Sequence, residues 1–595
     1  MKGRIIKSVS VFLAVCVLFT AAPLNGFVGM KFPSLSSLTE KIDSIIPKTK
    51  AEAANTYTYG NYEYTVDSEK VCITKYTGSD SSVVIPDTID GYNVTEIGNS
   101  VFKDHSELTS VTLPKQLKMV GEEAFTGTSI TSVVLPKTLK ESSSSLYSTE
   151  LDWNNEEVRI NSGPFGNCTK LTKVTFEDGA TVIPNQILRG AIYVNNVTIP
   201  NTVTKIEYGA FCECFSLTDV TIPDSVTDIG DRAFYDCFGL KTVKFSKNLK
   251  TMGSEVFTGT AITSVVLPKT LKECSDSVYS TELDWNNEEV RINPGPFGNC
   301  NKLTKVIFEE GTTVIANQVL HGAIYVNDVT IPNTVTKIGD SAFQDCLSLS
   351  KISLPDGVTE IGSNAFRQCL SLTDFTMPDS VTKIGSAVFY NSSNLASVKF
   401  SKSLKTMDSE AFTGTAITSV VLPKTLKECS DSVYSTELDW NNEEVRINPG
   451  PFGNCNKLTK VIFEEGTTVI ANQVLHGAIY VNDVTIPNTV TKIGDSAFQD
   501  CLSLSKISLP DGVTEIGSNA FRQCLSLTDF TMPDSVTDIG SAVFYNSSKL
   551  ASVKFSKSLK KIGSEAFTGT VITSVVLPKT LKESSSSLYS TELDW

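Results

Sequence analysis

The chain has 595 residues, 40% of them hydrophobic, and a formal net charge of −15. It is far longer than one ordinary domain and carries enough apolar side chains for a large core. Nucleic-acid-binding proteins usually have a basic surface, so the acidic balance and the lack of a long Lys/Arg run argue against a nucleic-acid partner.

The first residues have the pattern of a secretory signal peptide. Three basic residues near the start precede an apolar run over about residues 9–19, which is too short for a comfortable membrane span. Cleavage would follow Ala22 or the small-residue cluster at 51–54, and the stretch between them would be a linker or part of a long leader. We therefore predict that residues 1–54 are a signal peptide and leader, and that the mature chain is secreted or on the cell surface without a transmembrane span.

One short unit recurs along nearly the whole chain. The segment VTIPDSVTDIGDRAFYDCFGLKTVKF, residues 220–245, returns with small changes, and its clearest marker is a phenylalanine after Ala or Val. Phe211, Phe234 and Phe257 are 23 residues apart, and Leu188 takes the marker position in another unit. Counting such leucines, the chain holds about nineteen units. A period of this length is typical of a solenoid.

A larger period is superimposed on the short one. Blocks 261–415 and 416–570 differ at five positions, and Trp285 and Trp440 are 155 residues apart. Trp153 and Trp285 are closer together by the length of one short unit, so the first block lacks one unit. A stacked array tolerates the loss of one whole unit, whereas a globular domain would not.

Each unit contains the signals of a strand, a turn and a compact segment. Leu217, Val220 and Ile222 alternate with polar residues in a run that ends at Pro223, which predicts a strand with these apolar side chains pointing inward. The following Ile-Gly predicts a turn. The A-F-x-x-C stretch would gather its apolar side chains on one side if it forms a helical turn. Stacked units would form a parallel β-sheet on one face, with short helical or irregular turns on the other.

The repeated sequence pattern AFxxCxxLTxVxIPxSVTxIG resembles the BspA-type leucine-rich repeats of bacterial surface proteins. The resemblance covers roughly residues 83–595 and implies a leucine-rich repeat solenoid. It also implies a short N-terminal β cap, for which residues 55–82 are the candidate. An end coil without a cap would expose its core. The function that the resemblance implies is adhesion to host or matrix proteins, or to other cells.

The last residues contain LPKTL, one letter from a cell-wall sorting signal of the LPxTG type. LPKT occurs four times in the chain, each time at the end of a predicted strand and never before Gly. We therefore interpret it as part of the repeat rather than as an anchor. The chain stops at Trp595 in the middle of a unit, so we expect an incomplete reading frame or a fragment.

Each long block also carries an insertion that contains a tryptophan and several carboxylates. Pro268 and Phe297 flank one insertion and are 29 residues apart, whereas the equivalent residues of a plain unit, Pro223 and Phe234, are much closer in the chain. An aromatic side chain beside acids would bind a sugar or a peptide. The alternative is that these tryptophans pack down and pin a long loop. The candidate side chains are Trp153, Trp285 and Trp440.

The outward-facing positions of the predicted strands carry Thr, Ser, Lys and Asp. They would line one broad face, which is either the binding surface or a row of solubilising β-formers. The candidate residues on this face are Asp219, Thr221, Lys244, Lys351 and Asp374.

The sequence carries no recognisable catalytic or metal-binding constellation. Nine of the 14 cysteines occupy one repeat position, shortly after the marker, which favours a small core residue over a disulfide framework or a zinc cluster. His321 and His476 are the same position in two blocks, and Arg189 fills it in the first block. We therefore predict no enzymatic activity, no catalytic residue, no metal and no cofactor.

Three functions fit these observations. The first is a secreted or cell-surface, adhesin-like protein that binds an extracellular protein or polysaccharide multivalently, because copied weak sites raise avidity. The second is a structural spacer whose functional module lies outside this chain. The third is an accessory protein that targets a polysaccharide through the loop tryptophans.

Overall fold

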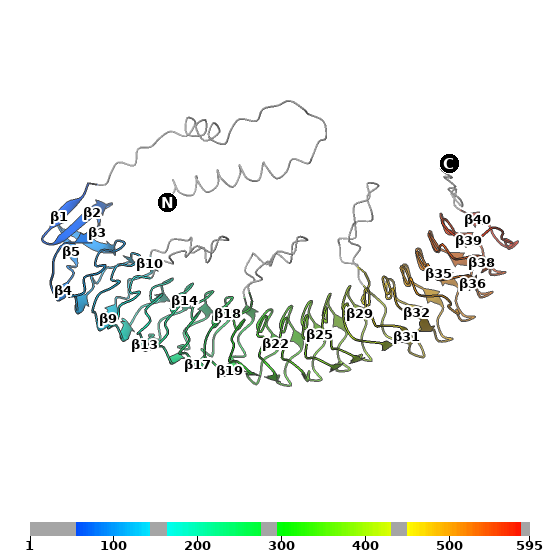
Figure 1. Ribbon diagram of the computed structural model, residues 1–595, viewed down its shortest axis with the longest axis horizontal. Coiled ribbons are helices and arrows are strands. Elements are labelled where there is room, and N and C mark those ends of the chain that lie inside the picture. The colour runs from blue at the N-terminus through cyan, green and yellow to red at the C-terminus, as the bar shows by residue number, and fades with distance from the viewer. Residues whose placement is uncertain (1–54, 143–162, 275–293, 430–448, 585–595) are drawn as a thin grey trace, which may run out of the picture. The chain divides into compact units, whose positions relative to one another are not determined.

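The computed structural model describes residues 55–142, 163–274, 294–429 and 449–584. Residues from Thr56 onward form one compact unit, in which successive coils, each one repeat unit long, stack in chain order, from blue to red in Figure 1. The predicted signal peptide and leader, 1–54, lie outside the described residues. The predicted parallel solenoid is confirmed.

Most coils place a strand on the alternating apolar run, which in many units ends at a proline. Val220 and Ile222 are buried while Asp219 and Thr221 are exposed, as the alternation predicts. Successive strands pair in parallel, with Asp219 opposite Thr242. We call this series the first ladder. Its strands are β4 (Ser82–Val84), β7 (Ser110–Thr112), β9 (Ser132–Leu135), β11 (Lys173–Phe176), β13 (Asn196–Thr198), β15 (Asp219–Thr221), β17 (Thr242–Lys244), β19 (Ser264–Leu267), β21 (Lys305–Phe308), β23 (Asp328–Thr330), β26 (Asp374–Thr376), β28 (Ser397–Lys399), β30 (Ser419–Leu422), β31 (Lys460–Phe463), β33 (Asp483–Thr485), β36 (Asp529–Thr531) and β38 (Ser552–Lys554).

The residues before the Ile-Gly turn form a second series of strands, which the sequence analysis missed. Ile206 pairs in parallel with Ile229, and both side chains are buried. The Thr336 hydroxyl donates to the carbonyl oxygen of Thr313, one coil earlier, at 3.2 Å. We call this series the second ladder. Its strands are β6 (Tyr92–Ile97), β8 (Met119–Val120), β10 (Glu141–Ser142), β12 (Val182–Ile183), β14 (Lys205–Ile206), β16 (Asp228–Ile229), β18 (Thr251–Met252), β20 (Glu273–Cys274), β22 (Val314–Ile315), β24 (Lys337–Ile338), β25 (Glu360–Ile361), β27 (Lys383–Ile384), β29 (Thr406–Met407), β32 (Val469–Ile470), β34 (Lys492–Ile493), β35 (Glu515–Ile516), β37 (Asp538–Ile539), β39 (Lys561–Ile562) and β40 (Glu583–Ser584).

The first ladder is interrupted at several coils, some of them one residue shorter than the repeat period and others of full length, as between β13 and β15. Hydrogen-bonded pairing stops between β17 and β19, and again between β28 and β30. Thr242 and Ser264 begin β17 and β19, and the interval between them is one residue shorter than the repeat period. The second ladder continues through the same coil, with Thr251 opposite Glu273. It therefore keeps the stack connected at these positions.

The marker segment is built from turns, and the described residues contain no helix. Of the two predicted alternatives, helical or irregular turns, the irregular one holds in the described residues. The N–H groups of Phe211 and Glu213 donate to the carbonyl oxygens of Ala233 and Tyr235 in the next coil, both at 2.8 Å. Glu213 has a φ of 60°, a left-handed conformation that lets alternate N–H groups face the next coil. We call the outer side of these segments the turn face.

The core is one continuous column of side chains. The rings of Phe211 and Phe234 stack with centroids 5.0 Å apart, and those of Phe234 and Phe257 with centroids 5.4 Å apart. Leu188 occupies the same position and is fully buried. Each fully buried side chain of this size contributes about 1.5–3 kcal/mol to folding. Because these side chains recur with the repeat period, the period predicts most of the stabilising contacts.

An antiparallel meander precedes the first coil. Tyr76, at the end of its third strand, places its ring 4.8 Å from the ring of Phe102, the first marker phenylalanine. The third strand also pairs in parallel with β6, which joins the meander to the second ladder. The strands concerned are β1 (Tyr57–Tyr59), β2 (Tyr62–Asp67) and β3 (Lys70–Tyr76), and β5 (Thr88–Ile89) pairs antiparallel with β6.

Candidate ligand-binding surface

The outer face of the first ladder presents three of the predicted site residues on two paired strands. Asp219 and Thr221 lie on β15 and Lys244 lies on β17, and all three side chains are exposed. Thr221 is directly opposite Lys244. The three residues therefore lie close together on one face, and their role in ligand binding stays a prediction.

The other two predicted residues lie in a column of alternating charge. Asp374 is on β26 and exposed, whereas residues 351–353 have no regular strand, so the strand predicted around Lys351 is wrong. Lys351 is nevertheless exposed. Earlier in the same column, Lys305 Nζ lies 2.8 Å from Asp328 Oδ2. Opposite charges on neighbouring coils attract, so this column neutralises much of its own charge.

The second ladder adds a half-buried column of charge that sequence reasoning missed. Lys337 Nζ lies 3.2 Å from Glu360 Oε2, and the copy in the next block joins Lys492 to Glu515 at 2.8 Å. These side chains belong to strands of the second ladder. Those strands are too short for an alternating pattern to reveal them in the sequence.

The turn face carries contacts between a buried basic side chain and a carboxylate at one repeated position. His321 Nε2 lies 3.2 Å from Asp345 Oδ2, and His476 repeats this contact with Asp500 at 3.2 Å. Arg189 fills the position in the first block, and its guanidinium lies 3.5 Å from the Glu213 carboxylate. The two histidines and Arg189 are all buried. The position holds Arg in the first block and His in the other two, and its partner on the next coil is an acidic residue each time. These contacts therefore join neighbouring coils.

An exposed aromatic pair lies between the turn face and the first ladder. Phe215 and Phe238 are 38% and 55% exposed, and their rings stack with centroids 5.0 Å apart. In the second and third blocks the equivalent residues include Leu370 and Leu525, which are also exposed. A signal for this pair was present in the sequence, because an apolar residue directly follows the repeat cysteine in both of these units.

The cysteine position after the marker lies in the core. The Cys237 thiol donates to the carbonyl oxygen of Phe211 at 3.1 Å, and Cys369 makes the same contact with Phe343 at 3.2 Å. The Ser392 hydroxyl repeats the contact with Phe366 at 2.8 Å. Burial raises the pKa of these thiols, since a thiolate would be desolvated there. All thirteen cysteines of the described residues are free thiols.

The predicted loop tryptophans Trp153, Trp285 and Trp440 lie outside the described residues. The chain returns from one of these insertions at Gly295, whose backbone N–H donates to the carbonyl oxygen of His321 at 2.9 Å. A Cβ atom on Gly295 would overlap the carbonyl oxygen of Gln318. Glycine is therefore required where the insertion rejoins the stack.

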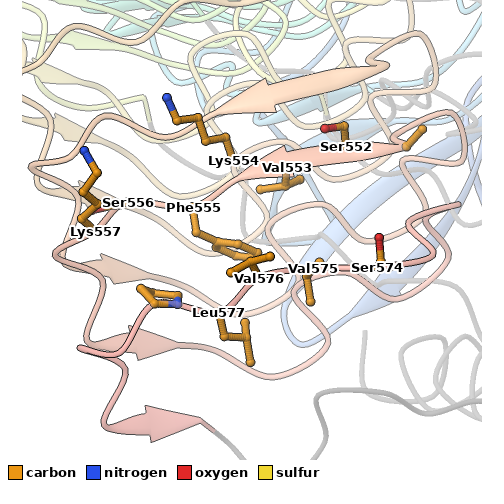
Figure 2. Close-up of a pocket in the computed structure, with 12 residues that line it drawn as sticks. Ser552, Val553, Lys554, Phe555, Ser556, Lys557, Ser574, Val575, Val576 and Leu577 are labelled. Atoms are coloured by element: carbon orange, nitrogen blue, oxygen red, sulfur yellow. The ribbon is translucent and has the colours of Figure 1, made fainter.

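A cavity of about 570 Å³ lies between β38 and residues 574–578. Figure 2 shows Phe555, Val576 and Leu577 along it. Leu577 is 49% exposed, whereas its copies Leu267 and Leu422 are fully buried. The copies are covered by the strand that pairs with them in the following coil, so the opening reflects the last described coil having no described successor.

Two kinds of feature are absent from the described part of the chain. No group of three or more His, Cys, Asp or Glu side chains is arranged there to hold a metal ion. No helix in that part is long and apolar enough to cross a membrane.

Comparisons with known proteins agree with this repeat architecture. A family described as the BspA type leucine rich repeat region (6 copies) matches residues 75–155, 158–286, 313–441 and 468–593. A search of curated proteins found no match.

Among solved structures, a leucine-rich repeat protein from Bacteroides ovatus is 20% identical, with 86% of this chain and 92% of that chain covered and a TM-score of 0.30. A leucine rich cell surface protein from Faecalibacterium prausnitzii is 21% identical, with 73% and 95% covered and a TM-score of 0.34. The family match spans well over half of the sequence and confirms the resemblance seen in the repeats. The chain belongs to the BspA-type leucine-rich repeat family.

Proposed function

We propose that the protein is a secreted or cell-surface binding protein that holds an extracellular protein or polysaccharide multivalently. The observation that carries this proposal is the duplication of exposed surface. Lys305, pairing with Asp328 at 2.8 Å, has its copy in Lys460, pairing with Asp483 at 2.8 Å. Any patch that binds a ligand in one block is therefore present again in the next, and two weak contacts on one stiff array raise avidity.

The location outside the cytoplasm rests on the sequence of residues 1–54, with its basic start and short apolar run. Action by binding rather than by catalysis fits the histidine positions. His321 and His476 are buried against aspartates, so they lie away from any substrate in solution.

A structural spacer is the second candidate, favoured by the self-neutralising columns. Lys337 and Glu360 satisfy each other's charge at 3.2 Å, as expected for a surface selected for stacking and solubility. On this view the array separates other modules and the exposed side chains bind nothing.

The experiment is a binding screen of residues 56–595 against immobilised matrix proteins and polysaccharides. Alanine at Lys351, Asp374 and their copies should weaken binding if the first ladder carries it. Alanine at Lys337, Glu360 and their copies is the matched control on the second ladder. No saturable binding to any member of the panel would favour the spacer. Loss of binding only with Trp285→Ala and Trp440→Ala would favour polysaccharide targeting by the loops.

A further inference from the structure

Four pairs of neighbouring coils place lysine next to lysine at two positions. In one pair, Lys247 and Lys250 follow β17, and Lys269 and Lys272 follow β19; all four side chains are exposed. We call such a set a lysine quartet. Numbered in chain order, this is the second quartet. The other three quartets, also exposed, are Lys115, Lys118, Lys137 and Lys140; Lys402, Lys405, Lys424 and Lys427; and Lys557, Lys560, Lys579 and Lys582.

The same contacts hold each quartet together. The Lys272 N–H donates to the carbonyl oxygen of Lys250 at 3.0 Å, and the Thr270 hydroxyl donates to the carbonyl oxygen of Lys247 at 2.9 Å. The first, third and fourth quartets repeat both contacts, with donor–acceptor distances between 2.8 and 3.1 Å. The four lysine side chains therefore start from a fixed backbone frame in every copy.

Lysine beside lysine departs from the charge pattern of the rest of the array. Elsewhere a lysine commonly faces a carboxylate on the next coil, as Lys305 faces Asp328 and Lys337 faces Glu360. Like charges on neighbouring coils repel one another. The chain nevertheless repeats this arrangement four times, although its net charge is −15.

Nearby carboxylates neutralise only part of a quartet. Asp224 lies 3.7 Å from Lys247, and the same aspartate contact recurs in the other three quartets. Glu309 accepts the backbone N–H of Lys269 rather than its ammonium group, and Glu273 is an exposed neighbour of Lys272. Within the described residues, Lys250, Lys269 and Lys272 have no carboxylate within ion-pair distance.

We propose that the lysine quartets bind an acidic polysaccharide, a linear chain that carries carboxylate or sulfate groups. Lysine is a flexible point charge that suits such groups without fixed geometry. The quartets hold no aromatic side chain on which a nucleic-acid base would stack. The second and third quartets are six coils apart, about 29 Å at the usual spacing of strands. That separation exceeds the Debye length in physiological salt, so the two quartets act as separate charged sites. Only an extended ligand can contact both of them.

This inference names a ligand class for the proposed function and rests on it. The probes are heparin, polygalacturonate and a short DNA duplex, and the measurement is their affinity for residues 56–595 at low and physiological salt. One variant combines Lys250→Gln, Lys272→Gln, Lys405→Gln and Lys427→Gln. The control combines Lys103→Gln, Lys205→Gln, Lys337→Gln and Lys492→Gln. Both variants lose four positive charges, but the control lysines all have acidic partners and lie outside the first-ladder column tested above.

The quartet variant should bind at least one polysaccharide about tenfold or more weakly than the wild type, because lost contacts multiply in a multivalent complex. The control should change little, and salt should weaken binding by the wild type. Equal losses in both variants, or DNA binding as tight as polysaccharide binding, would overturn the inference. So would wild-type protein that binds neither polysaccharide. In that case, binding to a protein in the wider screen would leave the proposed function standing.

Discussion

The ring of Phe366 lies parallel to the ring of Phe343, with centroids 5.2 Å apart and an interplanar angle of 1°. Phe366 also stacks on Phe389 in the following coil, at 5.6 Å. Its side chain therefore joins three coils, and the array depends on such contacts between neighbours.

Replacing Phe366 with alanine should lower the free energy of unfolding by about 3–5 kcal/mol, because a fully buried ring leaves a cavity between two others. Phe366→Leu should cost clearly less, since Leu320 fills the same position in another coil and is fully buried. Urea unfolding measures both costs, and hydrogen exchange in the flanking coils localises them. Equal, small losses in the two variants would show that the ring column is not a main source of stability.

Cys369 should tolerate replacement by serine. Its thiol donates to the carbonyl oxygen of Phe343, and the Ser392 hydroxyl makes the equivalent bond to Phe366. We expect Cys369→Ser to change stability by no more than about 1.5 kcal/mol, the size of one ordinary hydrogen bond. Cys369→Leu should cost more, about 1–3 kcal/mol, by overpacking. Thermal unfolding of the two variants decides this, and a serine variant that unfolds like the leucine variant would contradict it.

The ion pair between Asp379 and Lys402 makes a pH-dependent contribution. The Lys402 side chain donates a hydrogen bond that lowers the pKa of Asp379, and Asp379 in turn raises the pKa of Lys402. A carboxyl group whose pKa is lower in the folded state stabilises that state above its unfolded pKa, about 3.9, and the contribution is lost as the pH falls through the folded pKa.

The difference in Tm between the wild type and Asp379→Asn should therefore be present at pH 6 and shrink below about pH 4. It should be small, because both side chains are more than half exposed and salt screens the pair. At high pH the lysine part of the contribution is lost as the pH rises through the raised pKa of Lys402. A Tm difference that grows at low pH would contradict the assignment.

Gly295→Ala should destabilise the coil that follows the second insertion. The added Cβ would overlap the Gln318 carbonyl oxygen, and a backbone atom cannot move aside as a flexible side chain does. Gly357→Ala is the control, because its Cβ would approach no atom closer than 3.1 Å. We expect about 1–3 kcal/mol or more for the first variant and much less for the second. Urea unfolding with equal costs for both would show that the insertion rejoins the stack differently.

The sequence was sufficient for the fold because one pattern repeats many times. The alternation around Val220 and Ile222 predicts the first ladder, and the short repeat period predicts the stacking of Phe211 on Phe234. The second ladder escaped prediction because strands such as β14 and β16 are very short, and alternation needs a longer run. The turns of the marker segment depend on left-handed residues such as Glu213, whose conformation no local sequence rule requires.

The candidate surface was predictable only in part. Exposure of Asp219, Thr221 and Lys244 follows from strand alternation. The ion pair between Lys305 and Asp328 depends on which residues of neighbouring coils lie side by side. The three-dimensional stacking of the coils decides this, and the sequence of a single unit does not show it. The lysine quartets are of the same kind, because residues one coil apart in the chain become neighbours on the surface.

The central claim is that duplicated surface gives multivalent binding, and the most direct test compares the full array with a variant lacking residues 416–570. That deletion removes one near-identical block and keeps the repeat period intact. Binding of both proteins is measured on surfaces with high and low density of a ligand found in the screen. The account predicts that the full array dissociates more slowly than the deletion variant at high density, and that the two bind equally at low density, where only one contact forms. Equal binding at both densities would contradict the account and leave the array as a spacer.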